Sequence, residues 1–161
     1  MKADGYVYVV RLPPTAVTAA KTLIQIKAGA AMIEIVSARI YQVTKTTSEL
    51  LAVQMIQHTG AVTPGTVTAF TPLPLAATDP VALAVGGTAA TGVNASAEPS
   101  GGAANIVEET VWNILNGEWL YLPVPENRIQ VAQTKLFTFK LNTAPAASMI
   151  IGATVTFIEY Q

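Results

Sequence analysis

Short runs of β-branched and aromatic residues, separated by proline, glycine and asparagine, recur along the whole chain and constrain its fold more than any other feature. The clearest run is Ser148 to Tyr160. Its apolar residues on one side are Met149, Ile151, Ala153, Val155 and Phe157, and Thr154 and Thr156 take the other side. This period of two predicts a strand with one buried face.

Ten such runs predict ten strands. They are Tyr6 to Arg11, Thr22 to Ala28, Met32 to Tyr41, Leu50 to His58, Val67 to Leu75, Val107 to Leu115, Trp119 to Val124, Arg128 to Ala132, Lys135 to Leu141 and Ser148 to Tyr160. The pattern predicts an all-β protein, an antiparallel β-sandwich of jelly-roll-like type with about ten strands. A closed barrel is the alternative. Between Met32 and Tyr41 the apolar phase shifts, which indicates either a bulge or burial on both faces.

The 161 residues predict a single domain. Residues 1–14 are expected to form an edge strand or an exchanged arm, because Pro13 and Pro14 should end the first strand. Residues 72–102, rich in proline, glycine, alanine and threonine, predict a long loop excursion with short strands near 81–85 and 93–97. Ala16 to Ile26 contains several alanines, but its threonines and isoleucines favour a loop that leads into a strand over a helix.

Charged residues make up 12% of the chain, against roughly 25% in an average soluble domain. A spanning helix is not expected, because Lys21, Lys27, Glu34, Arg39 and Lys45 interrupt the most hydrophobic third. The amino terminus does not fit a secretory signal, so the chain is expected to stay in the cell that makes it. No basic cluster is present, which argues against nucleic acid as a partner. A surface with so little charge suggests a subunit covered by neighbours.

Asn116 and Gly117 lie between two apolar runs and predict a hairpin with a two-residue type I′ turn. Its register places Trp112, Ile114, Trp119 and Tyr121 on one side, and Val111, Leu115, Leu120 and Leu122 on the other. Both sides are apolar, so both need cover, either from the chain's own long loop or from a partner. We predict an interface made by Tyr6, Tyr8, Trp112, Ile114, Trp119 and Tyr121, since aromatic residues anchor interfaces.

The sequence predicts no catalytic, cofactor or metal site. His58 is the one histidine, and its alternation with Leu51, Val53 and Met55 predicts that it points to solvent. Glu108 and Glu109 are adjacent, so on a strand they project to opposite faces and do not form a catalytic pair. The chain has no cysteine and no acidic loop suited to zinc or calcium. Residues 86–92 are rich in glycine but lack the lysine of a phosphate-binding loop.

Three phrases carry a resemblance to a known family. They are residues 18–26 (TAAKTLIQI), residues 70–75 with 79–82 (FTPLPL and DPVA), and residues 94–99 (NASAEP). The chain resembles the small β-rich structural proteins of tailed bacteriophages that decorate or cement a capsid. The resemblance implies a non-enzymatic virion protein, assembled in the host cytoplasm, that forms a homo-oligomer, commonly a trimer, and binds the major capsid protein or another virion protein. A carbohydrate-binding β-sandwich, with the same aromatic residues as a platform for sugar rings, is the alternative.

Overall fold

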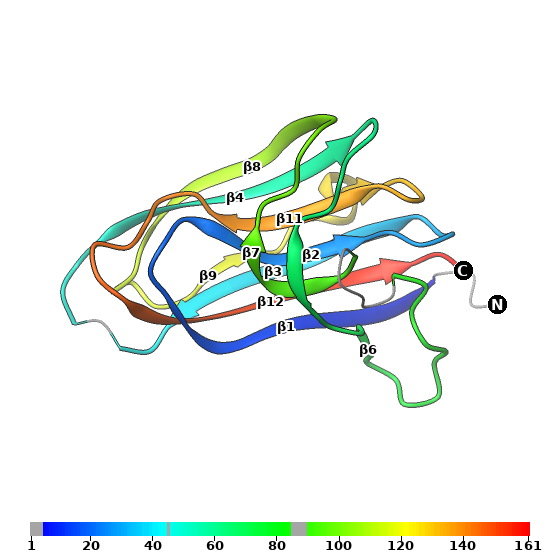
Figure 1. Cartoon of the computed structure of the whole chain (residues 1–161). Helices are drawn as coiled ribbons and strands as arrows, with labels where there is room; N and C mark the ends of the chain where they lie inside the picture. Colours follow the sequence, from blue (N-terminus) through cyan, green and yellow to red (C-terminus); the bar gives the residue numbers. More distant parts are fainter. Residues whose placement is uncertain (1–4, 45, 85–89) are drawn as a thin grey trace.

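The protein folds into two antiparallel sheets packed face to face (Figure 1). The structure is a computed structural model that describes residues 5–44, 46–84 and 90–161. Sheet A has the order β10 (Ile129–Val131), β3 (Ile33–Gln42), β12 (Met149–Glu159), β1 (Tyr6–Val17) and β6 (Leu73–Pro74), and β9 (Trp119–Tyr121) also pairs with β3. Sheet B has the order β5 (Thr66–Ala69), β7 (Gly92–Ala97), β2 (Lys21–Lys27), β11 (Leu136–Leu141), β4 (Leu50–Thr59) and β8 (Ala103–Asn113).

This architecture confirms the predicted all-β sandwich, with twelve strands where about ten were expected. The chain passes repeatedly from one sheet to the other, with β1, β3 and β12 in sheet A and β2, β4 and β11 in sheet B. Such crossing is characteristic of a jelly-roll-like winding. One 3-10 turn, η1 (Pro125–Asn127), connects β9 to β10. Among the described residues there is no helix with the length and hydropathy to cross a membrane.

The core lies between the two sheets and is built by the alternation read in the sequence. On β12, Met149, Ile151, Ala153, Val155 and Phe157 are all buried, as predicted. The phase shift on β3 is a bulge: Thr156 lies opposite Ser37 and Phe157 opposite Ile35, so Val36 is the extra residue. Strands of both sheets contribute to one contiguous apolar cluster that extends from Tyr8 to Phe157.

The first strand does not end at its prolines. β1 pairs with β12 from Tyr6 to Val17, and its register shifts between Leu12 and Thr15, which accommodates Pro13 and Pro14 as an irregularity. On its other side β1 pairs with β6 at Tyr8 and Val9. Pro13 and Pro14 lie beyond this pairing, so the N–H groups that they lack are not required there. Residues 6–14 therefore belong to the chain's own sheet, while residues 1–4 lie outside the described residues.

The predicted hairpin at Asn116 and Gly117 is wrong. β8 pairs with β4 in sheet B and β9 pairs with β3 in sheet A, so residues 114–118 cross from one sheet to the other. Gly117 has a φ of 85°, but Asn116 is not among the residues with positive φ, and a type I′ turn needs both. The indole N–H of Trp112 donates to the Gly117 carbonyl at 2.9 Å and fixes this crossing.

The long excursion contains two strands, β6 and β7, and its described loop is held against sheet A. The carboxylate of the buried Glu159 accepts the backbone N–H groups of Leu83 and Ala84 at 2.7 and 2.8 Å. The Tyr8 hydroxyl donates to the Pro80 carbonyl at 3.0 Å. A strand was expected near 81–85 and near 93–97; β7 confirms the second, residues 81–84 form no strand, and Val85 lies outside the described residues.

A corner in sheet B covers part of that sheet's outer surface. The β4–β8 pairing runs to Thr59 and Ala103, continues at Thr63 and Ser100, and resumes as the β5–β7 pairing. The buried Gln25 of β2 fastens this corner, because its side chain accepts the Gly65 N–H at 2.8 Å and donates to the Ala90 carbonyl at 2.5 Å. The corner segment, residues 60–65 and 98–102, thus lies over strands that the sequence pattern would leave open to solvent.

Candidate interaction surface

The six predicted interface residues fall into two groups. Tyr8, Trp112 and Ile114 are buried in the chain's own core, with 3% of Trp112 exposed. The prediction that these three contact a partner is therefore wrong, because the opposite sheet already covers them. Tyr6, Trp119 and Tyr121 are partly buried and pack against the core. For them, contact with a partner stays a prediction.

Trp119 and Tyr121 hold the two sheets together at one side of the sandwich. The indole of Trp119, on sheet A, stacks on Phe139 of sheet B with ring centroids 5.9 Å apart, and on Tyr121 at 6.5 Å. Burial raises the pKa of the Tyr121 hydroxyl above its ordinary value, and the negative charge of Glu108 adds to the effect. Most of the surface of Trp119 and Tyr121 is therefore buried within the chain itself, where it stabilises the fold.

The aliphatic residues on the other side of the same segments are the exposed ones. Seven of the fourteen exposed large apolar side chains of the described residues lie between positions 106 and 124. We call them the β8–β9 rim: Ile106, Val107, Val111, Leu115, Leu120, Leu122 and Val124. They lie on two faces: Ile106 and Val111 are opposite Ile56 and Ala52 on the outer face of sheet B, whereas Leu120 and Leu122 line a hollow with Val9 on the outer face of sheet A.

The rim includes a long open strand edge. β8 has β4 as a partner on one side, lies at the end of sheet B, and ten of its eleven residues are exposed or half-buried. The other terminal strands are short: β5, β6 and β10 have four, two and three residues. Short edges are a common protection against unwanted strand pairing, so β8 is the exception in this fold.

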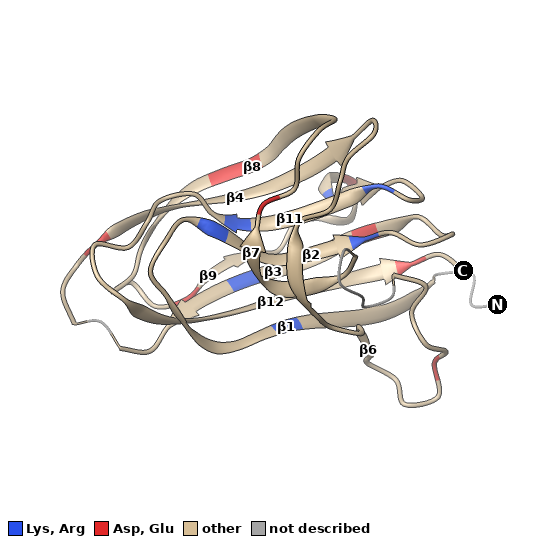
Figure 2. Cartoon of the chain, in the orientation of Figure 1, with Lys and Arg blue, Asp and Glu red and all other residues tan. Residues whose placement is uncertain are grey.

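Two features modify the β8 edge. Met55 lies opposite Glu108 and Ile56 opposite Ile106, so Val107 is an extra, bulged residue. Glu108 and Glu109 are the charged residues of the strand, and Figure 2 shows them as a red segment on β8 with no blue beside it on that strand. Glu109 accepts a hydrogen bond from the Gln54 side chain on the outer face. Glu108 faces the space between the sheets.

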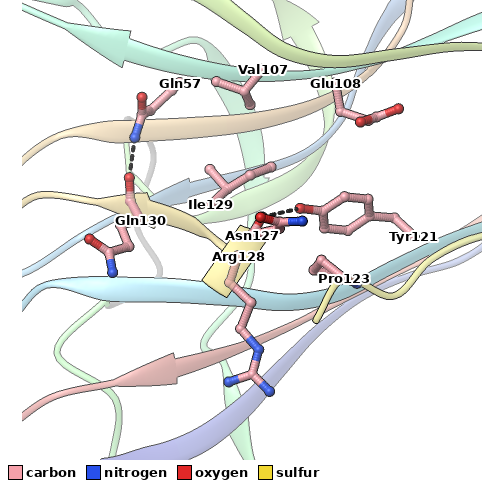
Figure 3. Close-up of a pocket in the computed structure, with 9 residues that line it drawn as sticks. All are labelled: Gln57, Val107, Glu108, Tyr121, Pro123, Asn127, Arg128, Ile129 and Gln130. Atoms are coloured by element: carbon pink, nitrogen blue, oxygen red, sulfur yellow. Dashed lines mark hydrogen bonds between the residues drawn. The ribbon is translucent and has the colours of Figure 1, made fainter. Parts of the chain in front are cut away.

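A cleft of about 490 Å³ opens beside Glu108, between the edges of the two sheets (Figure 3). Its walls are Gln57, Val107, Glu108, Tyr121, Pro123, Asn127, Arg128, Ile129 and Gln130. The Gln57 side chain donates across the sheets to the Gln130 carbonyl, and the Tyr121 hydroxyl donates to the Asn127 carbonyl at 3.1 Å. Arg128 forms an ion pair with Glu34 at 3.0 Å. The cleft therefore offers amide groups, a carboxylate and part of an aromatic ring to a ligand.

His58 is not at this surface, and the prediction that it points to solvent is wrong. Its side chain is buried, and its Nε2 lies 2.9 Å from the Thr138 hydroxyl oxygen. Burial lowers the pKa of the imidazole below its ordinary value, partly offset by the negative charge of Glu98. The strand alternation was read correctly, but the corner segment covers this outer face. Among residues 5–44, 46–84 and 90–161 no cluster of three potential metal-ligating acidic, histidine or cysteine side chains occurs.

Sequence reasoning missed the exposed edge of β8 and the aliphatic rim, because it assigned the aromatic side of these segments to the surface. The adjacent Glu108 and Glu109, within an otherwise apolar strand, were the available signal. It also missed Glu98, which accepts the Thr22 N–H and hydroxyl at 2.6 and 2.8 Å and pairs with Lys140 at 3.2 Å. Nothing in the local pattern indicates that contact, which joins positions 76 residues apart.

Comparison with known proteins gives no family. No family model matches the chain, and no curated protein matches it. Among solved structures, the D431N mutant VP2 protein of Infectious Bursal Disease Virus, from T=1 particles, is similar at a TM-score of 0.14 and 12% sequence identity. That alignment covers 98% of this chain, and this chain spans 38% of the VP2 chain. A likeness of this size carries no argument about function.

Proposed function

We propose that this protein is a non-enzymatic virion structural subunit, which self-associates and decorates or cements the capsid of a tailed bacteriophage. One observation carries the proposal: among the described residues, seven of the fourteen exposed large apolar side chains belong to the β8–β9 rim. A monomer gains nothing from a rim of this kind, whereas a subunit of a lattice covers it. The low content of charge, 12%, supports the same conclusion.

A second apolar cluster supports association between copies. Leu73, Leu75, Val81 and Leu83 are exposed on β6 and the loop that follows it. β6 lies at one end of sheet A, while β9 and β10 lie at the other. Leu73 lies opposite Val9, and Val9 lines one hollow with Leu120 and Leu122, so apolar side chains from both ends of sheet A share its outer face. An apolar face of this kind suits burial in an oligomer, such as the trimer expected from the phage resemblance.

Self-association is tested by light scattering coupled to size-exclusion chromatography over a range of protein concentrations. Leu120→Asp and Leu122→Asp should lower the molar mass, because each places a charge in the rim. Val43→Asp is the matched control, since Val43 is 59% exposed but lies outside the rim. A wild-type chain that stays monomeric at every concentration contradicts the proposal.

The location on the virion is tested by electron microscopy. An antibody against the purified chain is applied to phage particles that carry this reading frame, and gold label over the head is the expected result. Label confined to the tail, or absent from particles, contradicts capsid decoration.

The second candidate function is a carbohydrate-binding module. The cleft beside Tyr121 favours it, because amide and carboxylate groups next to an aromatic ring match the hydroxyls and the apolar face of a sugar. A glycan array with the purified chain tests this function. Glycan binding by a stable monomer, lost in Tyr121→Ala and in Gln130→Ala, would favour this candidate over the virion subunit.

A further inference from the structure

We propose that the outer face of sheet A binds a phosphate group, held between the guanidinium groups of Arg11 and Arg39 and above the hydroxyl of Thr154. The three residues lie on the adjacent strands β1, β3 and β12, with β12 in the middle. The site is distinct from the cleft beside Glu108, and it does not depend on the proposed self-association.

The strand register aligns the three side chains in one row across the sheet. Arg11 lies opposite Thr154 in the β1–β12 pairing, and Thr154 lies opposite Arg39 in the β12–β3 pairing. Directly opposite residues share a face, and this is the outer face, because the next residue of β12, Ala153, is in the core. Figure 2 shows a blue segment on β1 and another on β3, with β12 between them. Neighbouring strands lie about 4.8 Å apart, so two long side chains that start about 10 Å apart can converge on one anion.

The hydroxyl of Thr154 lacks a hydrogen-bond partner. Its Oγ1 atom is buried, yet no other described residue donates to it or accepts from it. Buried polar atoms are almost always paired, and an unpaired one costs free energy. A phosphate oxygen that enters between the two arginine side chains supplies the missing acceptor for this O–H group.

A hollow of about 400 Å³ adjoins the row and gives the ligand room. The short side chains of Thr154, Thr156 and Ser37 line it from the two central strands. Thr156 lies opposite Ser37, two residues along β12 from Thr154, so their hydroxyls are further donors for phosphate oxygens. Leu120 and Leu122 line the hollow from the β9 side and suit the carbon skeleton of a phosphate ester.

The charges on this face favour a phosphate. Arg11 is exposed, and no ion pair joins it to a carboxylate among the described residues. Arg39 reaches Glu118 at 3.8 Å, and these two side chains are 49% and 47% exposed. So long and exposed an ion pair adds little stability and exchanges easily for another anion. Two guanidinium groups match a dianion with several oxygens, because each forms charge-assisted, bidentate hydrogen bonds with phosphate.

Isothermal titration calorimetry of the full chain with inorganic phosphate, in a chloride buffer of fixed ionic strength, tests the site. We expect saturable binding with a dissociation constant below about 1 mM, and binding of acetate, a monoanion, that is at least about tenfold weaker. Glucose 6-phosphate is the second probe. Tighter binding than inorganic phosphate identifies a phosphate ester as the ligand, and equal or weaker binding identifies the free ion. Absence of saturable phosphate binding overturns the proposal.

Four variants and a control separate the site from general attraction to positive charge. Arg11→Gln and Arg39→Gln should each raise the dissociation constant for phosphate about tenfold or more, because each removes one charged contact. Thr154→Val should raise it about threefold without lowering the Tm, because the lost hydroxyl has no partner in the free protein. Glu118→Gln should lower it, because it releases Arg39. Lys27→Gln, on sheet B, is the matched control and should have no effect.

NMR chemical shifts locate the bound phosphate. The backbone amides of β12 and the side-chain Nε–H signals of Arg11 and Arg39 should shift with one saturation curve. Shifts that do not saturate, or wild-type affinity in both arginine variants, overturn the site. Because the proposed oligomer would cover this face, the titrations are made below the concentration at which light scattering detects association. Failure to bind phosphate then overturns this site alone, and a wild-type chain that is always monomeric overturns the proposed function alone.

Discussion

Replacement of Trp119 by alanine distinguishes a residue that holds the sheets together from one that docks a partner. The indole is partly buried, stacks on Phe139 across the sheets and on Tyr121 along the strand, and packs against the core. Because of these contacts, Trp119→Ala should lower the stability of the folded chain itself, and the effect should not depend on association.

The size of the effect follows from the burial of the ring. Full burial of a tryptophan gives a loss of about 3–5 kcal/mol on truncation to alanine. The indole here keeps some exposure, and its stacked neighbours relax only in part, so we expect about 2–4 kcal/mol. For a chain of this length, that corresponds to a fall in Tm of about 4–16 °C. Leu120 is the matched control, because it lies between the two aromatic residues and is 50% exposed; Leu120→Ala should cost less than about 0.5 kcal/mol.

The assay is urea unfolding at a low protein concentration, followed by circular dichroism and by the fluorescence of the remaining Trp112. The midpoint should fall for Trp119→Ala and stay near wild type for Leu120→Ala, with equal slopes. The reasoning is refuted if the two variants have the same midpoint while Trp119→Ala reduces the mass of the oligomer. That result would mean that the indole contacts a neighbour and not the core.

Three further predictions concern contacts inside the fold. The pKa of His58 is lowered by burial, so the unfolded state binds the proton more readily; stability should fall as the pH drops below about 6.5, with a slope of at most about 1.4 kcal/mol per pH unit, and His58→Gln should reduce that slope in chemical denaturation. Gln25→Leu leaves the Gly65 N–H and the Ala90 carbonyl without their side-chain partner and should cost about 2–4 kcal/mol, with faster amide exchange at Gly65; unchanged exchange would contradict the fastening of the corner. Glu159→Ala removes the acceptor of the Leu83 and Ala84 N–H groups and should speed proteolysis of the loop between β6 and β7, whereas Glu49→Ala, at the far end of the molecule, should not.

The sequence predicts the strands well because their alternation depends on local spacing. The period of two on β12 and the phase shift on β3 both correspond to what the chain does, a half-buried strand and a bulge. The prediction of a hairpin turn at Asn116 and Gly117 is wrong for a physical reason. A glycine with positive φ serves equally in a hairpin and in a crossing between sheets, and only the distant partners β4 and β3 decide between them.

The candidate interaction surface could not be predicted from the sequence for a related reason. Alternation shows which side chains share a face, but not which face the rest of the chain covers. Trp112 and Val111 were placed correctly on opposite sides, yet the aromatic side is the buried one. His58 is a second example. Its alternation on β4 was read correctly, because it lies on the outer face of sheet B, but it is buried because the corner segment folds back over that face. Both outcomes depend on contacts between segments far apart in the sequence.

The strand edges of this sandwich bear on the proposed self-association, because they determine whether copies pair through their backbones. Unprotected edges extend indefinitely by backbone pairing, which any sequence can supply. Here β5, β6 and β10 are too short for that, β1 has prolines, and β8 has a bulge and two carboxylates at its centre. Backbone pairing is thus discouraged at these edges of the described structure, while aliphatic side chains beside β8 and β6 stay exposed. The proposed association therefore depends on contacts between side chains more than on backbone pairing between edge strands.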